Sequence, residues 1–266
     1  MVLNRDKLSR VRDNLTARQR DLVDALSLLF SVNHPTLPGF VSTEMPIGVC
    51  DYAPNTATLR TVSRISKSFN YERHAQKHRR RAIKGLYLIG SPGTIVYSKS
   101  SDFDIWLIHD PQLKDSSLAE LKSKAQRIES FAASLKLEMH SLIFDARRFR
   151  LGETLSLSDE SSGSSQHYLL LDEFYRSGLL LAGLKPLWWC VPPSDEHRYE
   201  DYIAEESKRK NIVTEDYVDF GGLANVPAAE FFGAAVWQLY KSIDSPYKLV
   251  LKLLLMGTYA ADFPNG

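Results

Sequence analysis

Cysteine, net charge and long apolar runs are all scarce in this 266-residue sequence, and each shortage excludes a class of protein. Two cysteines, Cys50 and Cys190, are too few for a disulfide framework and have no metal-ligand spacing, which is typical of a reducing compartment. A formal net charge of +1 gives no overall field that would attract nucleic acid or a membrane surface. The apolar runs near 179–191 and 249–256 are too short to span a bilayer, and the N-terminus lacks the core of a signal peptide. We therefore expect a cytoplasmic protein without membrane insertion.

The positive charge that is present is unevenly distributed. Residues 1–81 hold fourteen Lys and Arg against seven Asp and Glu, and much of this excess lies in the run 73–81. Such a run is most often a solvated surface, and the alternative is a basic rim that steers a polyanionic substrate such as a nucleotide triphosphate. We expect no nucleic-acid partner, because one short basic run without interleaved aromatic residues is not a binding face.

Hydrophobic periodicity predicts a fold of the α+β class with a small mixed sheet. Apolar residues at helical spacing predict a helix over 6–29, and short apolar runs predict the strands 86–90, 102–108 and 136–144, with a helix over 115–134 between the last two. The later chain reads as helical over 166–181, 227–243 and 246–260. We expect three segments: a helical and irregular one over 1–80, a catalytic core over 81–190 and a helical one over 191–266.

Two aspartates begin the second expected strand. Asp102 and Asp104 are two residues apart, so on a strand their carboxylates face the same side. Two such carboxylates stay jointly ionised only when a cation lies between them, and Mg²⁺ is the usual one because it takes one or two carboxylates plus substrate phosphates. This pattern indicates metal-assisted chemistry on a nucleotide, with Mg²⁺ as the expected cofactor and Mn²⁺ as the alternative.

A third carboxylate is expected beside this pair, since two-metal phosphoryl or nucleotidyl transfer needs one to complete the metal site. The next expected strand offers Glu138 near its start and Asp145 at its end. Parallel pairing of the two strands would favour Glu138, and antiparallel pairing would favour Asp145. We prefer Glu138 and predict that Asp102, Asp104 and Glu138 are the catalytic and metal-binding residues.

Substrate contacts are predicted on both sides of the aspartate pair. Gly90 lets the backbone approach a phosphate, and Ser91 adds a hydroxyl and an amide where a turn begins. Trp106 shares a face with the aspartates by the two-residue period, so it either stacks on a base or packs in the core. His140 and His167 have no partner at metal spacing, and we expect both to be structural.

Gly90-Ser91 followed by Asp102-x-Asp104 resembles the signature of the polymerase-β-like nucleotidyltransferase superfamily. More specifically, the sequence resembles the N-terminal catalytic portion of class I adenylate cyclases, the enterobacterial type. Four blocks carry this resemblance: 34–39, 98–106, 166–176 and 230–248. The last block is the most specific.

The resemblance implies a nucleotidyltransferase core with flanking helices that binds ATP and converts it to 3′,5′-cyclic AMP and pyrophosphate. It further implies that Ser100 and Ser101 support the metal site and that Lys241 neutralises the leaving pyrophosphate, with Lys248 and Arg176 as further candidates. Family members continue into a regulatory C-terminal region that these 266 residues lack. Two alternatives stay open, namely nucleotide transfer to a separate acceptor and a truncated remnant that binds nucleotide without turnover.

Overall fold

The computed structural model of this chain describes residues 2–71, 81–90, 92, 102–152 and 167–223, together with positions 230, 233, 236, 250, 253, 254, 257 and 258. By its internal contacts the chain divides into two compact units. Unit 1 comprises 1–146, 177–185 and 215–218, and unit 2 comprises 147–176, 186–214 and 219–266. The three-segment division expected from the sequence stays a prediction.

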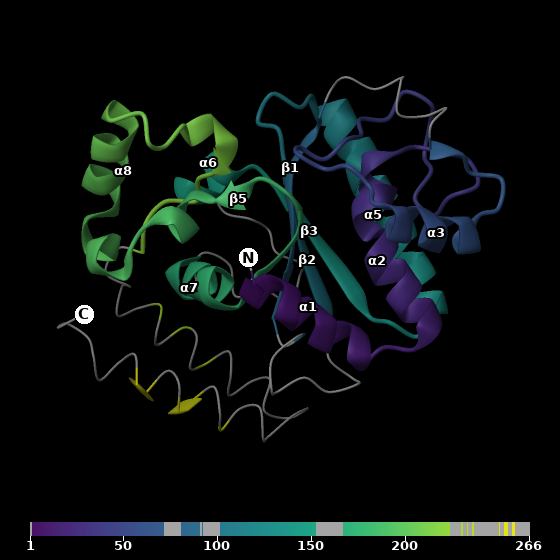
Figure 1. Ribbon diagram of the computed structural model, residues 1–266, viewed down its shortest axis with the longest axis horizontal. Coiled ribbons are helices and arrows are strands. Elements are labelled where there is room, and N and C mark those ends of the chain that lie inside the picture. The colour runs from purple at the N-terminus through teal and green to yellow at the C-terminus, as the bar shows by residue number, and fades with distance from the viewer. Residues whose placement is uncertain are drawn as a thin grey trace. The chain divides into compact units, whose positions relative to one another are not determined.

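Unit 1 is built on a four-stranded mixed sheet (Figure 1) with the strand order β3-β2-β1-β4. The strands are β1 (Ile83–Ile89), β2 (Phe103–His109), β3 (Met139–Phe144) and β4 (Leu179–Gly183). β1 is antiparallel to both β2 and β4, and β2 is parallel to β3. This mixed sheet confirms the predicted α+β class, and two short strands, β5 (Lys185–Pro186) and β6 (Tyr217–Val218), lie outside it.

The helices α2 (Ala17–Ser31) and α5 (Asp115–Ser134) lie along one face of this sheet (Figure 1). Alternate residues of β2 belong to the hydrophobic core on the face that these helices cover: Phe103, Ile105 and Leu107. Because side chains alternate along a strand, the residues between them, Asp104 among them, point to the opposite face. The packing of the core therefore determines which face of the sheet presents the aspartates.

The helix expected over 6–29 is in fact two helices, α1 (Val2–Asp13) and α2, so this prediction was wrong. Thr16 ends the continuity because its hydroxyl accepts a hydrogen bond from the amide of Gln19, while the Gln19 side chain accepts one from the amide of Thr16. This reciprocal capping box satisfies the amides of Thr16 and Gln19 at the start of α2. In a continuous helix these amides would instead donate to carbonyl groups of the preceding turn.

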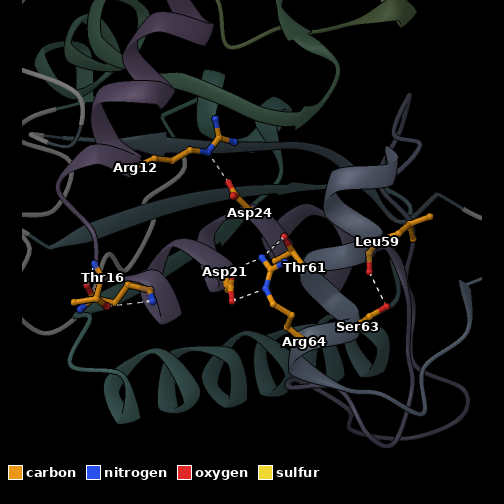
Figure 2. A network of polar contacts seen from close by, with 9 residues as sticks. Arg12, Thr16, Asp21, Asp24, Leu59, Thr61, Ser63 and Arg64 are labelled. Carbon is orange, nitrogen blue, oxygen red and sulfur yellow. Dashed lines mark hydrogen bonds and ion pairs between the residues drawn. The ribbon is translucent and has the colours of Figure 1, made fainter.

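Ion pairs tie the first three helices together, as Figure 2 shows. Arg12 of α1 lies 2.6 Å from Asp24 of α2. Arg64 of α3 (Thr56–Ile65) donates to Asp21 of α2, with an Nε to Oδ2 distance of 3.1 Å, and also to Thr61 at 3.0 Å. Pairs this exposed contribute little stability each.

The helix expected over 166–181 ends earlier, because α7 (His167–Ser177) is followed by β4. The residues from Leu179 onward pair with β1 instead of continuing the helix. Gly183 makes the close approach feasible: a Cβ there would lie 2.5 Å from the carbonyl oxygen of Lys84, and its φ is +97°. Tertiary pairing thus overrides the helical periodicity of this apolar stretch.

Unit 2 contains the helices α6 (Ala146–Arg150) from Arg147 onward, α7 and α8 (Tyr199–Lys208). It also contains the 3₁₀ turns η2 (Leu187–Cys190) and η3 (Pro193–Arg198), and η4 (Thr214–Asp216) lies at its boundary. The Trp188 ring stacks on Tyr175 with a centroid distance of 4.6 Å and an interplanar angle of 5°. Trp188 is buried and is therefore part of the core of this unit. Cys50 and Cys190 are both free thiols, as expected.

A buried carboxylate caps the start of α7. Glu230 is 5% exposed, and its Oε2 accepts hydrogen bonds from the amides of Tyr168 at 2.9 Å and Leu169 at 3.2 Å. Burial raises the pKa of Glu230, while the two amides act in the opposite direction. The helices expected over 227–243 and 246–260 fall mostly outside the described residues, and the single positions described there are helical.

Glu230→Ala is expected to lower the free energy of unfolding by about 2 kcal/mol, because two helix amides lose a charged acceptor. Glu230→Gln keeps an acceptor oxygen and should cost about half as much. Urea denaturation followed by circular dichroism would measure both changes. Asp201→Ala, which removes an exposed carboxylate from α8, is the control, and equal effects of the Asp201 and Glu230 changes would contradict the capping role.

In the part of the chain that the structure describes, no helix has both the length and the apolar character needed to span a membrane.

Candidate active site

The register of β2 and β3 brings the expected carboxylates to one end of the sheet. The two strands run in parallel, with Phe103 opposite Met139 and Asp104 opposite His140. The amide of Phe103 donates to the carbonyl oxygen of Glu138 at 2.9 Å, so Asp102 and Glu138 begin neighbouring strands. Parallel pairing was the condition that favoured Glu138 as the third carboxylate, and this condition is met.

Asp145 lies at the opposite end of β3, directly after Phe144, and is 8% exposed. The length of β3 therefore separates it from the strand starts that carry Asp102 and Glu138. The geometry supports Glu138 over Asp145, and the catalytic role of Glu138 stays a prediction.

Asp102, Glu138 and His140 form a cluster in which one ligand atom of each residue lies within 4.8 Å of the others. All three side chains are exposed. Nε2 of His140 lies 3.4 Å from Oε1 of Glu138. From the sequence alone His140 is expected to be structural, because it has no partner at metal spacing along the chain. The signal that would have found it is the strand register, since residues 138 and 140 share a face with Asp104.

Gly90 follows the end of β1 and lies beside Asp104. Its φ is +87°, a left-handed conformation that L side chains rarely adopt. A Cβ at this position would lie 3.5 Å from Oδ2 of Asp104 and 3.8 Å from Cδ of Pro92. The absence of a side chain thus keeps the backbone open next to the second aspartate, where the sequence reasoning expects phosphate.

Trp106 is 3% exposed, and its ring packs edge to face against Phe144 with a centroid distance of 5.0 Å. Of the two roles considered for it, core packing is the one that the described contacts support. Stacking on a base stays a prediction. Arg176, the further candidate for charge neutralisation, pairs with Asp172 at 2.7 Å and lies over the Trp188 ring in unit 2.

Four of the expected substrate-binding residues lie outside the described residues: Ser91, Ser100, Ser101 and Lys241. The same holds for Lys248 and for most of the basic run, residues 73–80. Arg81, at the end of that run, forms an ion pair with Asp51 at 3.2 Å.

The donor set at the strand starts suits a divalent cation. Exposed carboxylates supply the hard oxygen ligands that Mg²⁺ and Mn²⁺ prefer, and ordinary side-chain rotation at an exposed site is enough to bring such atoms onto one ion. Asp104 shares the face with this cluster because it pairs with His140 across the sheet. These residues can therefore hold a metal next to the open backbone at Gly90.

Comparison with solved structures gives a weak similarity. The crystal structure of a toxin-antitoxin with AMP-PNP aligns with 51% of this chain and 87% of that chain, at 19% sequence identity and a TM-score of 0.24. A similarity at this level carries no argument about fold or function.

Comparison with curated proteins gives strong similarity over the whole chain. The adenylate cyclase of Proteus mirabilis is 36% identical over 266 residues, which is 100% of this chain and 31% of that protein. The adenylate cyclases of Salmonella typhimurium strain LT2 and Escherichia coli strain K12 are each 36% identical over 264 residues, covering 99% of this chain and 31% of each relative. The chain thus spans about a third of the length of the relatives it matches.

Two family models match in succession along the sequence. Residues 1–189 match the adenylate cyclase NT domain, and residues 226–266 match the second domain of class-I adenylate cyclase. The first match covers more than half of the chain and includes the described residues of the candidate site, from Gly90 to His140. This chain is therefore a member of the class I adenylate cyclase family.

Proposed function

We propose that this chain forms part of an enzyme that converts ATP to 3′,5′-cyclic AMP and pyrophosphate. The observation that carries the proposal is the placement of Asp102, Asp104 and Glu138 at adjoining starts of β2 and β3, within a chain of the class I adenylate cyclase family. We also propose that the core is of the nucleotidyltransferase type and that the protein is cytoplasmic, where ATP is abundant.

The reaction is an intramolecular displacement at phosphorus. The ribose 3′ oxygen forms a bond to the α-phosphorus, the bond from the α-phosphorus to the bridging oxygen of the β-phosphate breaks, and the hydroxyl proton is lost to solvent or a basic group. Because nucleophile and phosphorus belong to one molecule, positioning supplies much of the rate acceleration.

The residues of this chain act by binding and orienting the substrate. A bound Mg²⁺ would lower the pKa of the 3′-hydroxyl and offset charge on the phosphates. The carboxylates of Asp102, Asp104 and Glu138 would hold that ion, and the open backbone at Gly90 would admit the triphosphate beside Asp104. We propose that Ser91, Ser100, Ser101 and Lys241 bind the phosphates and the leaving pyrophosphate. Trp106 is proposed to stack on the base.

The test is product analysis with ATP labelled at the α-phosphate. The purified chain is incubated with Mg²⁺ or Mn²⁺ and the products are separated by thin-layer chromatography. We expect labelled cyclic AMP, and we expect chelation of the metal by EDTA to abolish it. Label transferred to a separate acceptor would instead support a nucleotidyltransferase. ATP binding by calorimetry without product would support the non-catalytic alternative.

A further inference from the structure

The cluster at the strand starts contains a ligand that an all-carboxylate magnesium site would not need. His140 is the second residue of β3, directly opposite Asp104 in the register and two residues after Glu138. Its ring nitrogen is the only nitrogen donor in the described cluster of Asp102, Glu138 and His140. The cluster therefore combines two oxygen donors with one imidazole.

The spacing of these donors is compatible with a shared ion as well as with a long hydrogen bond. Nε2 of His140 and Oε1 of Glu138 are 3.4 Å apart, which is long for a charge-assisted hydrogen bond, whose usual length is about 2.7–2.9 Å. Two donors bound to one ion at about 2.1 Å are separated by about 3.0 Å in an octahedral site and about 3.4 Å in a tetrahedral one. The observed separation lies in the range that a common ion would produce.

The pairing of the strands keeps this arrangement in place. β2 and β3 are hydrogen bonded in parallel register from Phe103 and Met139 to Ile108 and Phe144. β3 is an edge strand of the sheet, and its amide at Ser141 is bound by Oε1 of Glu129 from α5 at 2.6 Å. The backbone on both sides of His140 is therefore fixed, so only side-chain rotation is needed to bring the three donors onto one ion.

We propose that His140 is a ligand of the divalent ion held by Asp102 and Glu138, and that it makes this site select Mn²⁺ and Zn²⁺ over Mg²⁺. Imidazole nitrogen is a good ligand for first-row transition ions, whereas Mg²⁺ binds oxygen and gives up water reluctantly. The inference extends the proposed function, since the ion is the one that the carboxylates of the candidate active site would hold. A transition ion would then compete with Mg²⁺ at that position.

The test measures ion binding to the whole chain without nucleotide, so it does not depend on turnover. Mn²⁺ is titrated into the protein and free Mn²⁺ is followed by electron paramagnetic resonance, with Mg²⁺ and Zn²⁺ as competitors. In wild type we expect Zn²⁺ to displace Mn²⁺ at a much lower concentration than Mg²⁺ does. His140→Asn should weaken Mn²⁺ binding about 10-fold or more and change Mg²⁺ binding less than about 3-fold, because it replaces the nitrogen donor with an oxygen.

Electron spin echo modulation of bound Mn²⁺ supplies a readout that a structural histidine would not affect. We expect a ¹⁴N coupling in wild type and its loss in His140→Asn. His197→Asn, which changes an exposed histidine in unit 2, is the control and should keep the coupling. A wild-type spectrum without ¹⁴N coupling, or an unchanged ratio of Mn²⁺ to Mg²⁺ affinity in His140→Asn, would overturn the assignment. If the coupling is lost in His140→Asn and the wild-type chain forms no cyclic AMP, the result supports His140 as a metal ligand. It then contradicts only the proposed reaction.

Discussion

Asp102→Asn and Asp104→Asn are each expected to lower the rate of cyclic AMP formation by about 100- to 1000-fold. Asparagine keeps the size of the side chain and removes the charge that holds a divalent ion. Both residues are exposed on the sheet face opposite the helices α2 and α5, so the substitutions leave the hydrophobic core untouched. The measurement is the initial rate of labelled cyclic AMP production at saturating ATP and Mg²⁺.

Two comparisons make this prediction specific. Asp115→Asn removes an exposed carboxylate at the start of α5 and should leave the rate within about 2-fold of wild type. The double substitution of Asp102 and Asp104 should cost little more than either single one, because residues that hold one ion act as a unit.

The same variants also test the site by metal-ion binding, which does not require turnover of ATP. Each substitution should weaken Mn²⁺ binding in the absence of nucleotide, since a carboxylate ligand is lost. Equal cyclic AMP output from wild type and both variants, with unchanged ion affinity, would contradict the assigned site.

The shared face of the two aspartates was predictable because side chains along a strand alternate between the two faces of the sheet. Asp102 and Asp104 are two residues apart, and the buried Phe103 between them fixes their direction toward the other face. The sequence supported only a preference for Glu138 over Asp145, since the choice depends on whether the two strands run in parallel. That direction follows from the path of α5, which returns the chain to the same end of the sheet at which β2 begins.

The errors came from apolar segments in which local pattern and tertiary pairing disagree. The stretch after Ser177 has helical periodicity, yet it forms β4 because β1 offers an unpaired edge. The break at Thr16 was missed because apolar residues continue at helical spacing across it, while the capping box that causes it depends on Thr16 and Gln19. The proximity of His140 to Asp102 could not be predicted, because the two residues are close in the sheet and distant in sequence.

The buried face of α5 carries the apolar residues Leu121, Ala125 and Ile128, and it also buries a lysine. Lys124 is 1% exposed, and its Nζ donates a hydrogen bond to the carbonyl oxygen of Val32 at 2.9 Å. Its stem packs under the turn at Gly39, where a Cβ would lie 3.1 Å from Cγ of Lys124. Burial removes this ammonium group from water, and within the part of the chain that the structure describes no carboxylate pairs with it.

Burial lowers the pKa of the Lys124 ammonium from 10.5 to about 7. Between these two values the unfolded chain binds this proton and the folded chain does not, so the contribution of Lys124 to stability rises with pH across the window. From pH 7 to pH 9.5 the expected increase in the free energy of unfolding is about 3 kcal/mol. Below pH 7 both states bind the proton, and this dependence disappears.

Lys124→Met is therefore expected to stabilise the folded chain by about 2 kcal/mol at pH 7. The variant removes a burial cost of about 4 kcal/mol, and it leaves the Val32 carbonyl without its donor at a cost of about 2 kcal/mol. By pH 9.5 the removed cost is only about 1 kcal/mol, so the gain should vanish or change sign. Urea denaturation at both pH values measures the difference, with Lys122→Met, an exposed lysine of the same helix, as the control. A gain for Lys124→Met that is the same at both pH values would mean that the buried ammonium does not carry the pH dependence of stability.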